Sequence, residues 1–303
     1  MTARFASGGT SKGYEMCSGP DFLCVGMAKA GTGWLGDQLR YHPQFWMPPV
    51  QELAYLGRNA PALRSANRKF SRIQERARKK RKPGKSRTDE RDVAFLRDIT
   101  ACTGEERSID KYLSFFRHKG DLLSGDISPG YSTLETEVIS ALAARLPDLR
   151  VILLIRDPVE RLWSHICMWH RNGKFDDTVL STPFRFREYL NDAEMATRRS
   201  FPTTILAHWE KFEPIIRFRH FFFDDIVARP ENVRSEVLSF LGADPEIAGD
   251  GIPASYNRKS QSTKLAMTEP IKAVLAEHFA GELRACATRM GGCATKWAAK
   301  YGL

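Results

Sequence analysis

A glycine-rich turn near the start of the chain has the residue types that bind an anion. It runs from Val25 to Leu35 as VGMAKAGTGWL, between an apolar segment and an amphipathic one. Its three glycines let the backbone bend tightly and approach a ligand closely. A helix that begins after them offers N–H donors and a partial positive charge, to which Lys29 adds a full charge and Thr32 a hydroxyl. We expect this turn to hold a phosphate-like group, with an ordinary glycine turn carrying a surface lysine as the alternative.

A second group of polar residues, from Ile155 to His165 (IRDPVERLWSH), follows the most apolar segment of the chain. Arg156 stands at the end of that segment, and Ser164 comes eight residues later, after a proline that suits a first helical turn. Because a guanidinium group recognises phosphate in a bidentate manner, we expect Arg156 and Ser164 to converge on one anion. Arg161 is expected to make a structural ion pair.

The apolar pattern of the chain predicts the strands and helices that position these two groups. The uninterrupted run Leu149–Arg156 predicts a central parallel strand covered on both faces, and Asp21–Gly26 predicts another buried strand. Amphipathic spacing predicts a helix after each of them, over Val159–Arg171 and Trp34–Tyr41. Further strands are expected over Asp121–Ile127 and Phe218–Phe223, and further helices over Asp92–Ile99, Ile109–Phe116, Glu135–Leu146, Thr203–Ile216, Asn232–Leu241 and Ile271–Met290.

This alternation of strands and helices predicts an α/β fold, with a P-loop-type parallel β-sheet flanked by helices. The 303 residues suffice for one large domain, and no linker divides them. We therefore expect a single domain over residues 19–303, after a flexible N-terminus at 1–18 and with a basic insertion at about 64–87.

The positive charge of the chain is concentrated in that insertion. The formal net charge is +10, and residues 64–87 hold twelve Lys or Arg and one acid, a local balance of +11 that leaves −1 for the rest. The segment is either a solvated insertion or a contact surface for an anionic acceptor, such as an acidic glycan or a lipid headgroup layer. Nucleic acid is not favoured as a partner, because Phe70 is the only aromatic residue among these charges.

Neither export nor membrane insertion is indicated by the sequence. No apolar run approaches the roughly 20 residues of a membrane-spanning helix, and the N-terminus lacks the apolar core of a secretory signal. We expect a cytoplasmic protein, with peripheral membrane contact as an alternative. The six cysteines form no CxxC pair and are expected to be reduced. Cys24 and Cys167 are expected in the core, whereas Cys286 and Cys293 could meet across a turn.

A nucleotide-hydrolysing P-loop is the obvious competitor for the first turn. That pattern has an initial glycine, four further residues and then Gly-Lys-Ser/Thr. Gly26 and Gly31 have the spacing, but Thr32 and Gly33 follow, and the lysine precedes Gly31. The turn can cradle a phosphate without matching the nucleoside-triphosphate version. A small-molecule kinase would also need a magnesium-binding acid after a strand, for which Asp126 is the candidate.

The segment Lys29–Leu35 resembles the 5′-phosphosulfate loop of the sulfotransferase family that uses 3′-phosphoadenosine 5′-phosphosulfate (PAPS). The family pattern is Lys-x-Gly-Thr-Thr/Ser-x-Leu, and Gly33 replaces its second hydroxyl residue. The stretch Arg156–Ser164 resembles the family's 3′-phosphate motif, Arg-x-Pro-x-x-Arg-x-x-Ser. The resemblance implies cofactor contacts from Lys29, Ala30, Gly31, Thr32, Gly33, Trp34, Arg156 and Ser164.

Three shorter segments agree with this resemblance. His42-Pro43 follows the first helix, as in the family. Gly125–Tyr131 resembles the Gly-Glu-x-Ser-Pro-x-Tyr segment of the Golgi-type glycan-modifying and bacterial branch. Arg258 and Lys259 lie in a polar loop where family members cover the nucleotide with basic residues. The resemblance assigns them to the 3′-phosphate, with an ordinary exposed loop as the alternative.

The general base is assigned from the same branch, in which a Lys-Glu pair follows the His-Pro segment. The matching place here holds Gln51-Glu52, so Glu52 is the candidate base and Lys29 is left as the catalytic lysine. A carboxylate that works near neutral pH must have its pKa raised by burial or be shielded from positive charge. The alternatives are a capping or surface role for Glu52, with His42, Asp126, His165 or His170 as the base.

The resemblance implies transfer of a sulfuryl group from PAPS to a hydroxyl or amine, with release of 3′-phosphoadenosine 5′-phosphate (PAP) and with no metal. The acceptor class stays open among carbohydrates, lipids and small molecules, and Phe175–Pro202 and the basic insertion are expected to shape its pocket. The competing interpretations are a P-loop small-molecule kinase and a catalytically inactive anion-binding protein.

Overall fold

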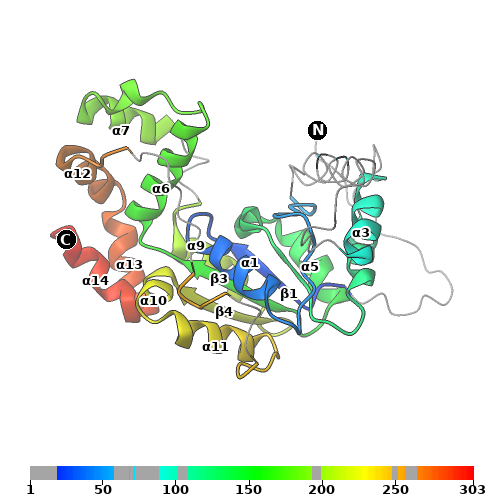
Figure 1. Ribbon diagram of the computed structural model, residues 1–303. Helices are drawn as coiled ribbons and strands as arrows, with labels where there is room; N and C mark the ends of the chain where they lie inside the picture. The colour runs from blue at the N-terminus through cyan, green and yellow to red at the C-terminus, as the bar shows by residue number, and fades with distance from the viewer. Residues whose placement is uncertain are drawn as a thin grey trace.

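A sheet of four parallel strands lies at the centre of the part of the chain that the computed structural model describes (Figure 1). The described residues are 19–57, 68, 71, 89–101, 108–192, 199–247, 252–256 and 265–303. The strands are β1 (Phe22–Gly26), β2 (Gly125–Ile127), β3 (Arg150–Ile155) and β4 (Arg217–Phe222), in the order β2-β1-β3-β4. The predicted α/β fold with a parallel sheet is therefore confirmed.

The register of the two central strands brings the two polar motifs together. Residues 22–26 of β1 and 151–155 of β3 are fully buried, as their apolar runs predict. Leu23 pairs with Val151, and Gly26 pairs with Leu153. The carboxyl ends of parallel strands meet at one edge of the sheet, where α/β proteins bind their ligands. The glycine-rich turn after β1 therefore lies beside Arg156, which follows β3.

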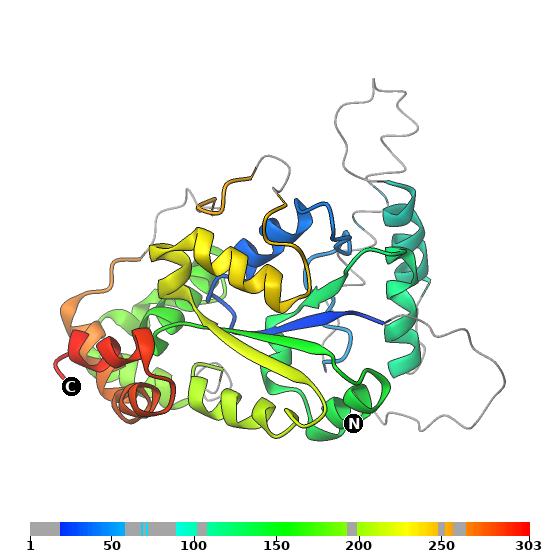
Figure 2. The ribbon, with the colours of Figure 1, turned by 90° about the horizontal axis from the view of Figure 1, so that it is seen from below.

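Helices cover both faces of the sheet. Figure 2 shows α1 (Thr32–Arg40) and α11 (Pro230–Phe240) on one side of it, and α5 (Thr136–Arg145) and α9 (Pro202–Glu210) on the other. The other α-helices are α3 (Glu90–Thr100), α4 (Ile109–Ser114), α6 (Pro158–Arg171), α7 (Pro183–Asp192), α10 (Phe223–Ala228), α12 (Glu269–His278), α13 (Ala280–Met290) and α14 (Thr295–Lys300). Short 3₁₀ helices are η1 (Phe115–Lys119), η2 (Pro129–Thr133), η3 (Asp177–Leu180) and η4 (Gly292–Ala294).

Three predicted elements differ clearly in extent from those observed. The helix expected over 203–216 is α9, which ends at Glu210 and is followed by hydrogen-bonded turns over 211–215. The strand expected over 121–127 begins only at Gly125, because Leu123 pairs instead with Phe45 in an isolated bridge outside the main ladder. The helix expected over 271–290 is two helices, α12 and α13. The break falls at Phe279, whose backbone (φ −100°, ψ 9°) is not helical and whose side chain is fully buried.

Four cysteines lie among the described residues, all with free thiols. Cys24 and Cys167 are buried in the core. The Sγ of Cys286 donates to Glu282 and that of Cys293 to Asp225, so these two thiols contact acids and do not bond to each other.

No helix among the described residues is long and apolar enough to cross a membrane. Several predictions fall outside the described residues: the one for residues 1–18, those for the basic insertion apart from Arg68 and Ser71, and those for Arg258 and Lys259.

Candidate functional site

The turn between β1 and α1 has the backbone geometry of a candidate anion site. Gly31 caps α1 in the left-handed region (φ 100°), where residues with a side chain are strained. A Cβ atom there would also stand 3.1 Å from Ile226 and 3.2 Å from Phe223. No side chain caps the helix, and its first turn carries no acid. The first N–H groups of α1 have no intrahelical acceptor, so they are placed to bind an anion.

Two arginines of the second motif hold this turn in place. Lys29 has a left-handed backbone (φ 72°), and its carbonyl accepts a hydrogen bond from Nη1 of Arg156 at 3.1 Å. The carbonyl of Ala28 accepts from Nε of Arg161 at 3.1 Å. These bonds stabilise a strained backbone conformation. The two motifs, far apart in the sequence, therefore form one site.

Positive charge is concentrated around Lys29. Burial lowers the pKa of its ammonium, and the charges of Arg171, Arg156 and Arg161 lower it further. Cations crowded in this way favour a bound anion, because the anion offsets their mutual repulsion. Arg171 was not singled out from the sequence. It stands at the far end of α6, and the only signal for it is a basic residue on the helix that follows Arg156.

The side chains of the second motif differ in their contacts. The guanidinium of Arg156 lies over the ring of Phe223, 4.6 Å from its centroid, and donates to Glu160 at 3.2 Å. Ser164, half-buried, is one turn beyond Glu160 and shares its helix face. Arg161 is fully buried and donates to Ser200 at 2.5 Å, which makes it part of the scaffold.

A hydrogen-bonded anchor holds the loop that carries Glu52. The N–H of Leu53 donates to Asp126 at 3.3 Å, and the N–H of Ala54 donates to Ser128 at 2.8 Å. The N–H of Leu56 donates to the hydroxyl of Tyr131 at 3.3 Å. The three acceptors all belong to the Gly125–Tyr131 segment. The segment therefore positions the loop of Glu52 through its polar side chains.

Asp126 is the centre of this anchor. It is almost fully buried and accepts from Ser128 at 2.6 Å and Tyr112 at 3.2 Å, as well as from Tyr131 and the N–H of Leu53. Burial raises the pKa of its carboxyl group, and the four donors oppose that rise. With its oxygens engaged in this way, Asp126 is a structural anchor. The arrangement counts against Asp126 as a general base or a magnesium ligand.

Glu52 lines a cavity of about 360 Å³ beside the first turn of α1. Thr32 and Gly33 line the same cavity, so Glu52 borders the space next to the candidate anion site. Glu52 has a left-handed backbone (φ 55°). Although solvent reaches the residue, partial desolvation and the charge of Asp126 raise its pKa, and Lys29 opposes the rise. A carboxylate with a raised pKa at the edge of an anion site is suited to accept a proton.

The histidines that the sequence offered as alternative bases have other surroundings. His42 is 1 % exposed, and its Nδ1 accepts from the N–H of Gln44 at 3.3 Å. Burial and Arg161 lower the pKa of His165 to about 3, so its imidazole is neutral and weakly basic. His170 pairs with Asp177 at 3.3 Å. These contacts favour structural roles for His42 and His165.

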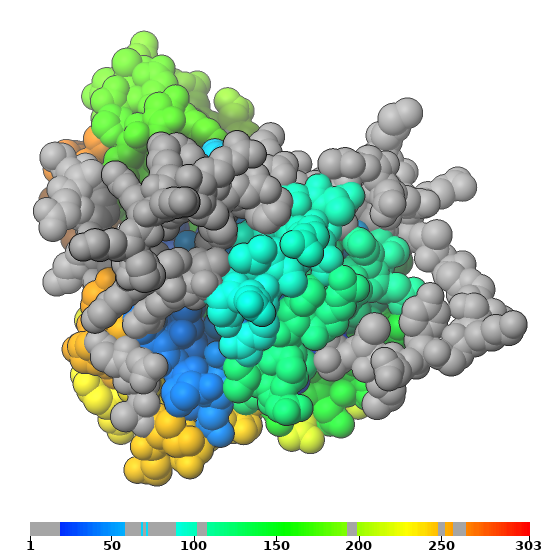
Figure 3. Space-filling model, turned by 45° about the vertical axis from the view of Figure 1, so that its right-hand side comes forward, coloured from blue at the N-terminus to red at the C-terminus, as the bar shows by residue number. Residues whose placement is uncertain are grey.

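The side chain of Trp34 anchors a segment next to the turn. Its Nε1 donates to the carbonyl of Ala254 at 2.7 Å, and Gln38 donates to the carbonyl of Pro253 at 3.1 Å. The indole is buried and its Nε1 is bonded to this segment, which leaves the backbone N–H of Trp34, in the first turn of α1, as its donor for an anion. Arg258 follows Ala254 by four residues and lies outside the described residues. Figure 3 shows α1 and the residues after it (blue) next to the residues near 245 (gold), where Gln44 accepts from the N–H of Asp244 at 2.7 Å.

Comparisons with known proteins agree with this arrangement. A family model described as the sulfotransferase family matches residues 20–246. A sulfotransferase from Alicyclobacillus acidocaldarius shares the fold with 17% identity and a TM-score of 0.56, covering 92% of this chain and 98% of that one. The sulfotransferase domain from the curacin biosynthetic pathway shares it with 16% identity and a TM-score of 0.50, covering 86% and 98%. No curated protein sequence matches the chain.

Proposed function

The chain belongs to the sulfotransferase family, whose members are PAPS-dependent transferases, and we propose that it moves a sulfuryl group from PAPS to a hydroxyl or amine of an acceptor, releasing PAP. The observation that carries this proposal is the joining of two anion-binding motifs around one helix N-terminus. Arg156 of one motif bonds to the Lys29 carbonyl of the other. PAPS carries anionic groups at two places, on the 5′ and 3′ positions of its ribose, and the two motifs match them in number and charge.

We assign the binding of PAPS, the sulfuryl donor, to the two motifs. The backbone of residues 30–34 (Ala30, Gly31, Thr32, Gly33 and Trp34) binds the 5′-phosphosulfate through the first turn of α1, where the helix dipole favours an anion. Lys29 adds its charge to the sulfuryl and bridging oxygens. Arg156 and Ser164 bind the 3′-phosphate, the first from just before α6 and the second from within that helix. Arg258 and Lys259 complete that phosphate site.

The transfer step uses Glu52 and Lys29. The acceptor oxygen or nitrogen attacks the sulfur atom, and the bond from sulfur to the bridging oxygen of the 5′-phosphate breaks. The acceptor proton moves to the carboxylate of Glu52, and the electron pair of the broken bond stays on PAP. As in phosphoryl transfer, positioning and stabilisation of the leaving-group charge lower the barrier. Lys29 and the α1 dipole supply that stabilisation.

The acceptor is assigned to the cavity beside Glu52. The volume of this cavity, about 360 Å³, lies within the range of small-molecule sites. Met47, Val50 and two prolines give it an apolar wall, and Arg40 and Glu52 add polar groups. A carbohydrate unit, a lipid headgroup or a small molecule fits these dimensions. We assign the basic segment 64–87 to contact with an anionic acceptor or headgroup layer, and we place the enzyme in the cytoplasm.

Two other functions make different predictions. A small-molecule kinase needs an acid that holds magnesium at the phosphates, and the candidate Asp126 is engaged by four protein donors. An inactive anion-binding protein needs only the two motifs and not the base. The family match supports the transferase over the kinase, and the raised pKa of Glu52 supports it over the inactive protein.

Radiolabelled transfer tests the proposal. The protein is incubated with [³⁵S]PAPS and a panel of carbohydrate, lipid and small-molecule acceptors, and labelled product and PAP are measured together. The proposal expects labelled product with at least one acceptor class, formed in equal amounts with PAP, and its loss in Glu52→Gln. PAP binding with no product from any class would favour the inactive anion-binding protein.

A further inference from the structure

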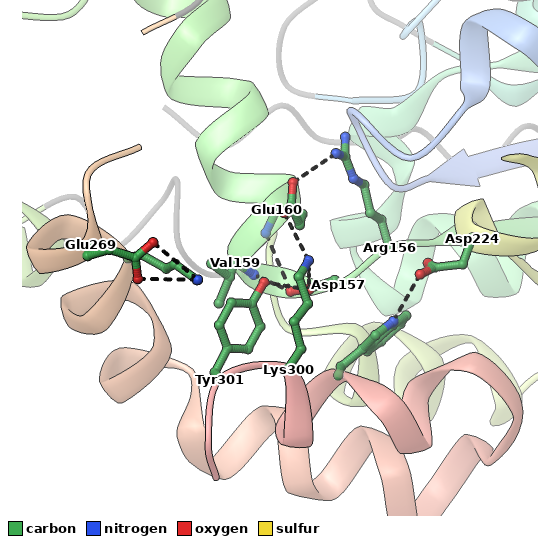
Figure 4. Close-up of polar contacts among 10 residues, drawn as sticks. Arg156, Asp157, Val159, Glu160, Asp224, Glu269, Lys300 and Tyr301 are labelled. Carbon is green, nitrogen blue, oxygen red and sulfur yellow. Dashed lines mark hydrogen bonds and ion pairs between the residues drawn. The ribbon is translucent and has the colours of Figure 1, made fainter. Parts of the chain in front are cut away.

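The end of helix α14 contacts the start of helix α6 beside the proposed 3′-phosphate site. Nζ of Lys300 lies 2.9 Å from Glu160 and 3.3 Å from Asp157. The hydroxyl of Tyr301 donates to Asp157 at 2.6 Å. Figure 4 shows Lys300 and Tyr301 pointing from the end of α14 toward these two acids, with Arg156 on the far side of Glu160.

Glu160 is shared between two cations. Its Oε2 accepts from Nη2 of Arg156 at 3.2 Å, and its Oε1 accepts from Nζ of Lys300. Asp157 is shared as well, because its Oδ1 caps α6 through the N–H of Val159 at 2.9 Å and its Oδ2 faces α14. The carboxylate of Glu160 therefore links the phosphate-binding arginine to α14.

The charge balance of this cluster depends on Lys300. Arg156 and Lys300 contribute +2, and Asp157 and Glu160 contribute −2, so the four side chains are neutral together. Without Lys300 the sum is −1, beside the place where a phosphate must bind. An acid next to a phosphate site repels the ligand and competes for the arginine.

We propose that Lys300 is a positioning residue for 3′-phosphate recognition, acting through Glu160 on Arg156. By pairing with Glu160, Lys300 weakens the hold of that carboxylate on the guanidinium and cancels its repulsion of the phosphate. Tyr301 assists by binding Asp157. This inference rests on the proposed function, since it presumes that the ligand carries a 3′-phosphate.

The location of α14 does not depend on Lys300 itself. Trp297 of the same helix is buried, and its Nε1 donates to Asp224 at 3.3 Å, next to the Phe223 ring that supports Arg156. The Lys300 side chain is 46% exposed, so its ion pairs add little to folding stability. Removing its charge should therefore change ligand binding while the fold stays intact.

Calorimetric titration with PAP and with adenosine 5′-monophosphate (AMP) tests the inference, because AMP lacks only the 3′-phosphate. Lys300→Ala is expected to weaken PAP binding by about threefold to fivefold and to leave AMP binding unchanged. Lys300→Arg should keep wild-type affinity for PAP. Lys296→Ala, which removes the same charge one turn earlier on α14, is the matched control and should change neither ligand.

The double variant Lys300→Ala with Glu160→Gln separates a charge effect from a structural one. Removing the unbalanced carboxylate should restore most of the lost PAP affinity. Equal losses for PAP and AMP, or no loss in Lys300→Ala, would overturn the inference while the proposed function stands. A wild-type protein that binds PAP no better than AMP would overturn both.

Discussion

Nη1 of Arg156 donates a hydrogen bond to the main-chain carbonyl of Lys29 at 3.1 Å, across 127 positions of sequence. Through this bond the residue assigned to the 3′-phosphate also fixes the backbone of the residue assigned to the sulfuryl group. The Phe223 ring supports the same guanidinium from one side. We therefore expect occupancy of one end of the proposed donor site to affect the geometry of the other.

Replacing Arg156 with lysine tests this double role. Arg156→Lys keeps the charge but loses the planar fork that can bond to the carbonyl and a phosphate together. PAP affinity is expected to fall by about tenfold or more, as for a bidentate contact worth roughly 1.5–3 kcal/mol. Calorimetry measures this loss. Arg217→Lys, on an exposed ion pair at the start of β4, is the control and should leave affinity unchanged.

Glu52→Gln tests the assignment of the base. The variant should keep PAP affinity and lose about 10²–10⁴-fold in kcat, the usual contribution of a general base.

The pH profile of the wild type tests the same assignment. Activity should rise with pH through the pKa of Glu52, which lies above its ordinary 4.5 because of desolvation and Asp126. It should fall again on the alkaline side below pH 10.5, where Lys29, with its lowered pKa, loses its charge. An unchanged acidic limb in Glu52→Gln would assign the base to another residue.

Asp126→Ala tests whether the buried acid is an anchor. Removing it leaves buried donors of Ser128, Tyr112 and Leu53 without their acceptor. We expect the free energy of unfolding to fall by about 2–4 kcal/mol in urea denaturation. The exposed Asp110→Ala should change it by less than about 1 kcal/mol. A variant with wild-type stability and no activity would point to a chemical role for Asp126 instead.

Two glycines of the turn should respond in opposite ways. Gly31→Ala forces a side chain into a left-handed conformation and against Phe223 and Ile226, so it should cost about 1–3 kcal/mol of stability and weaken PAP binding. A Cβ at Gly33 would meet no atom within 4 Å. Gly33→Ser restores the hydroxyl that the family pattern has there, and it should tighten PAP binding by about threefold. Weaker binding by Gly33→Ser would show that the glycine itself is needed.

Local sequence patterns were sufficient to predict the elements that carry the donor site. The apolar runs of β1 and β3, the glycines of the turn and the proline at the start of α6 determine these elements through neighbouring residues alone. The break at Phe279 could not be predicted in this way. It depends on a ring buried by tertiary packing, and the nearby Gly281 lies inside α13 and not at the break.

The contacts that hold the site in place were harder to predict, because they join segments far apart in the sequence. The anchoring of residues 53–56 by Asp126, Ser128 and Tyr131 pairs backbone groups with side chains more than seventy positions away. The contact of Lys300 with Glu160 spans 140 positions. The Gly125–Tyr131 segment resembles a family motif, but the motif does not say that its side chains bind the loop of Glu52. The contact of Lys300 with Glu160 has no motif of its own and becomes visible only when the chain is folded.

Titration of the wild-type protein with PAP and with ATP plus magnesium tests the central claim most directly. The two ligands share the adenosine and differ in the 3′-phosphate and the triphosphate. The account predicts that PAP binds at least about tenfold more tightly than ATP, a difference of about 1.4 kcal/mol, and that Arg156→Ala removes this preference. Binding of ATP with magnesium that matches or exceeds that of PAP would contradict it and favour a kinase.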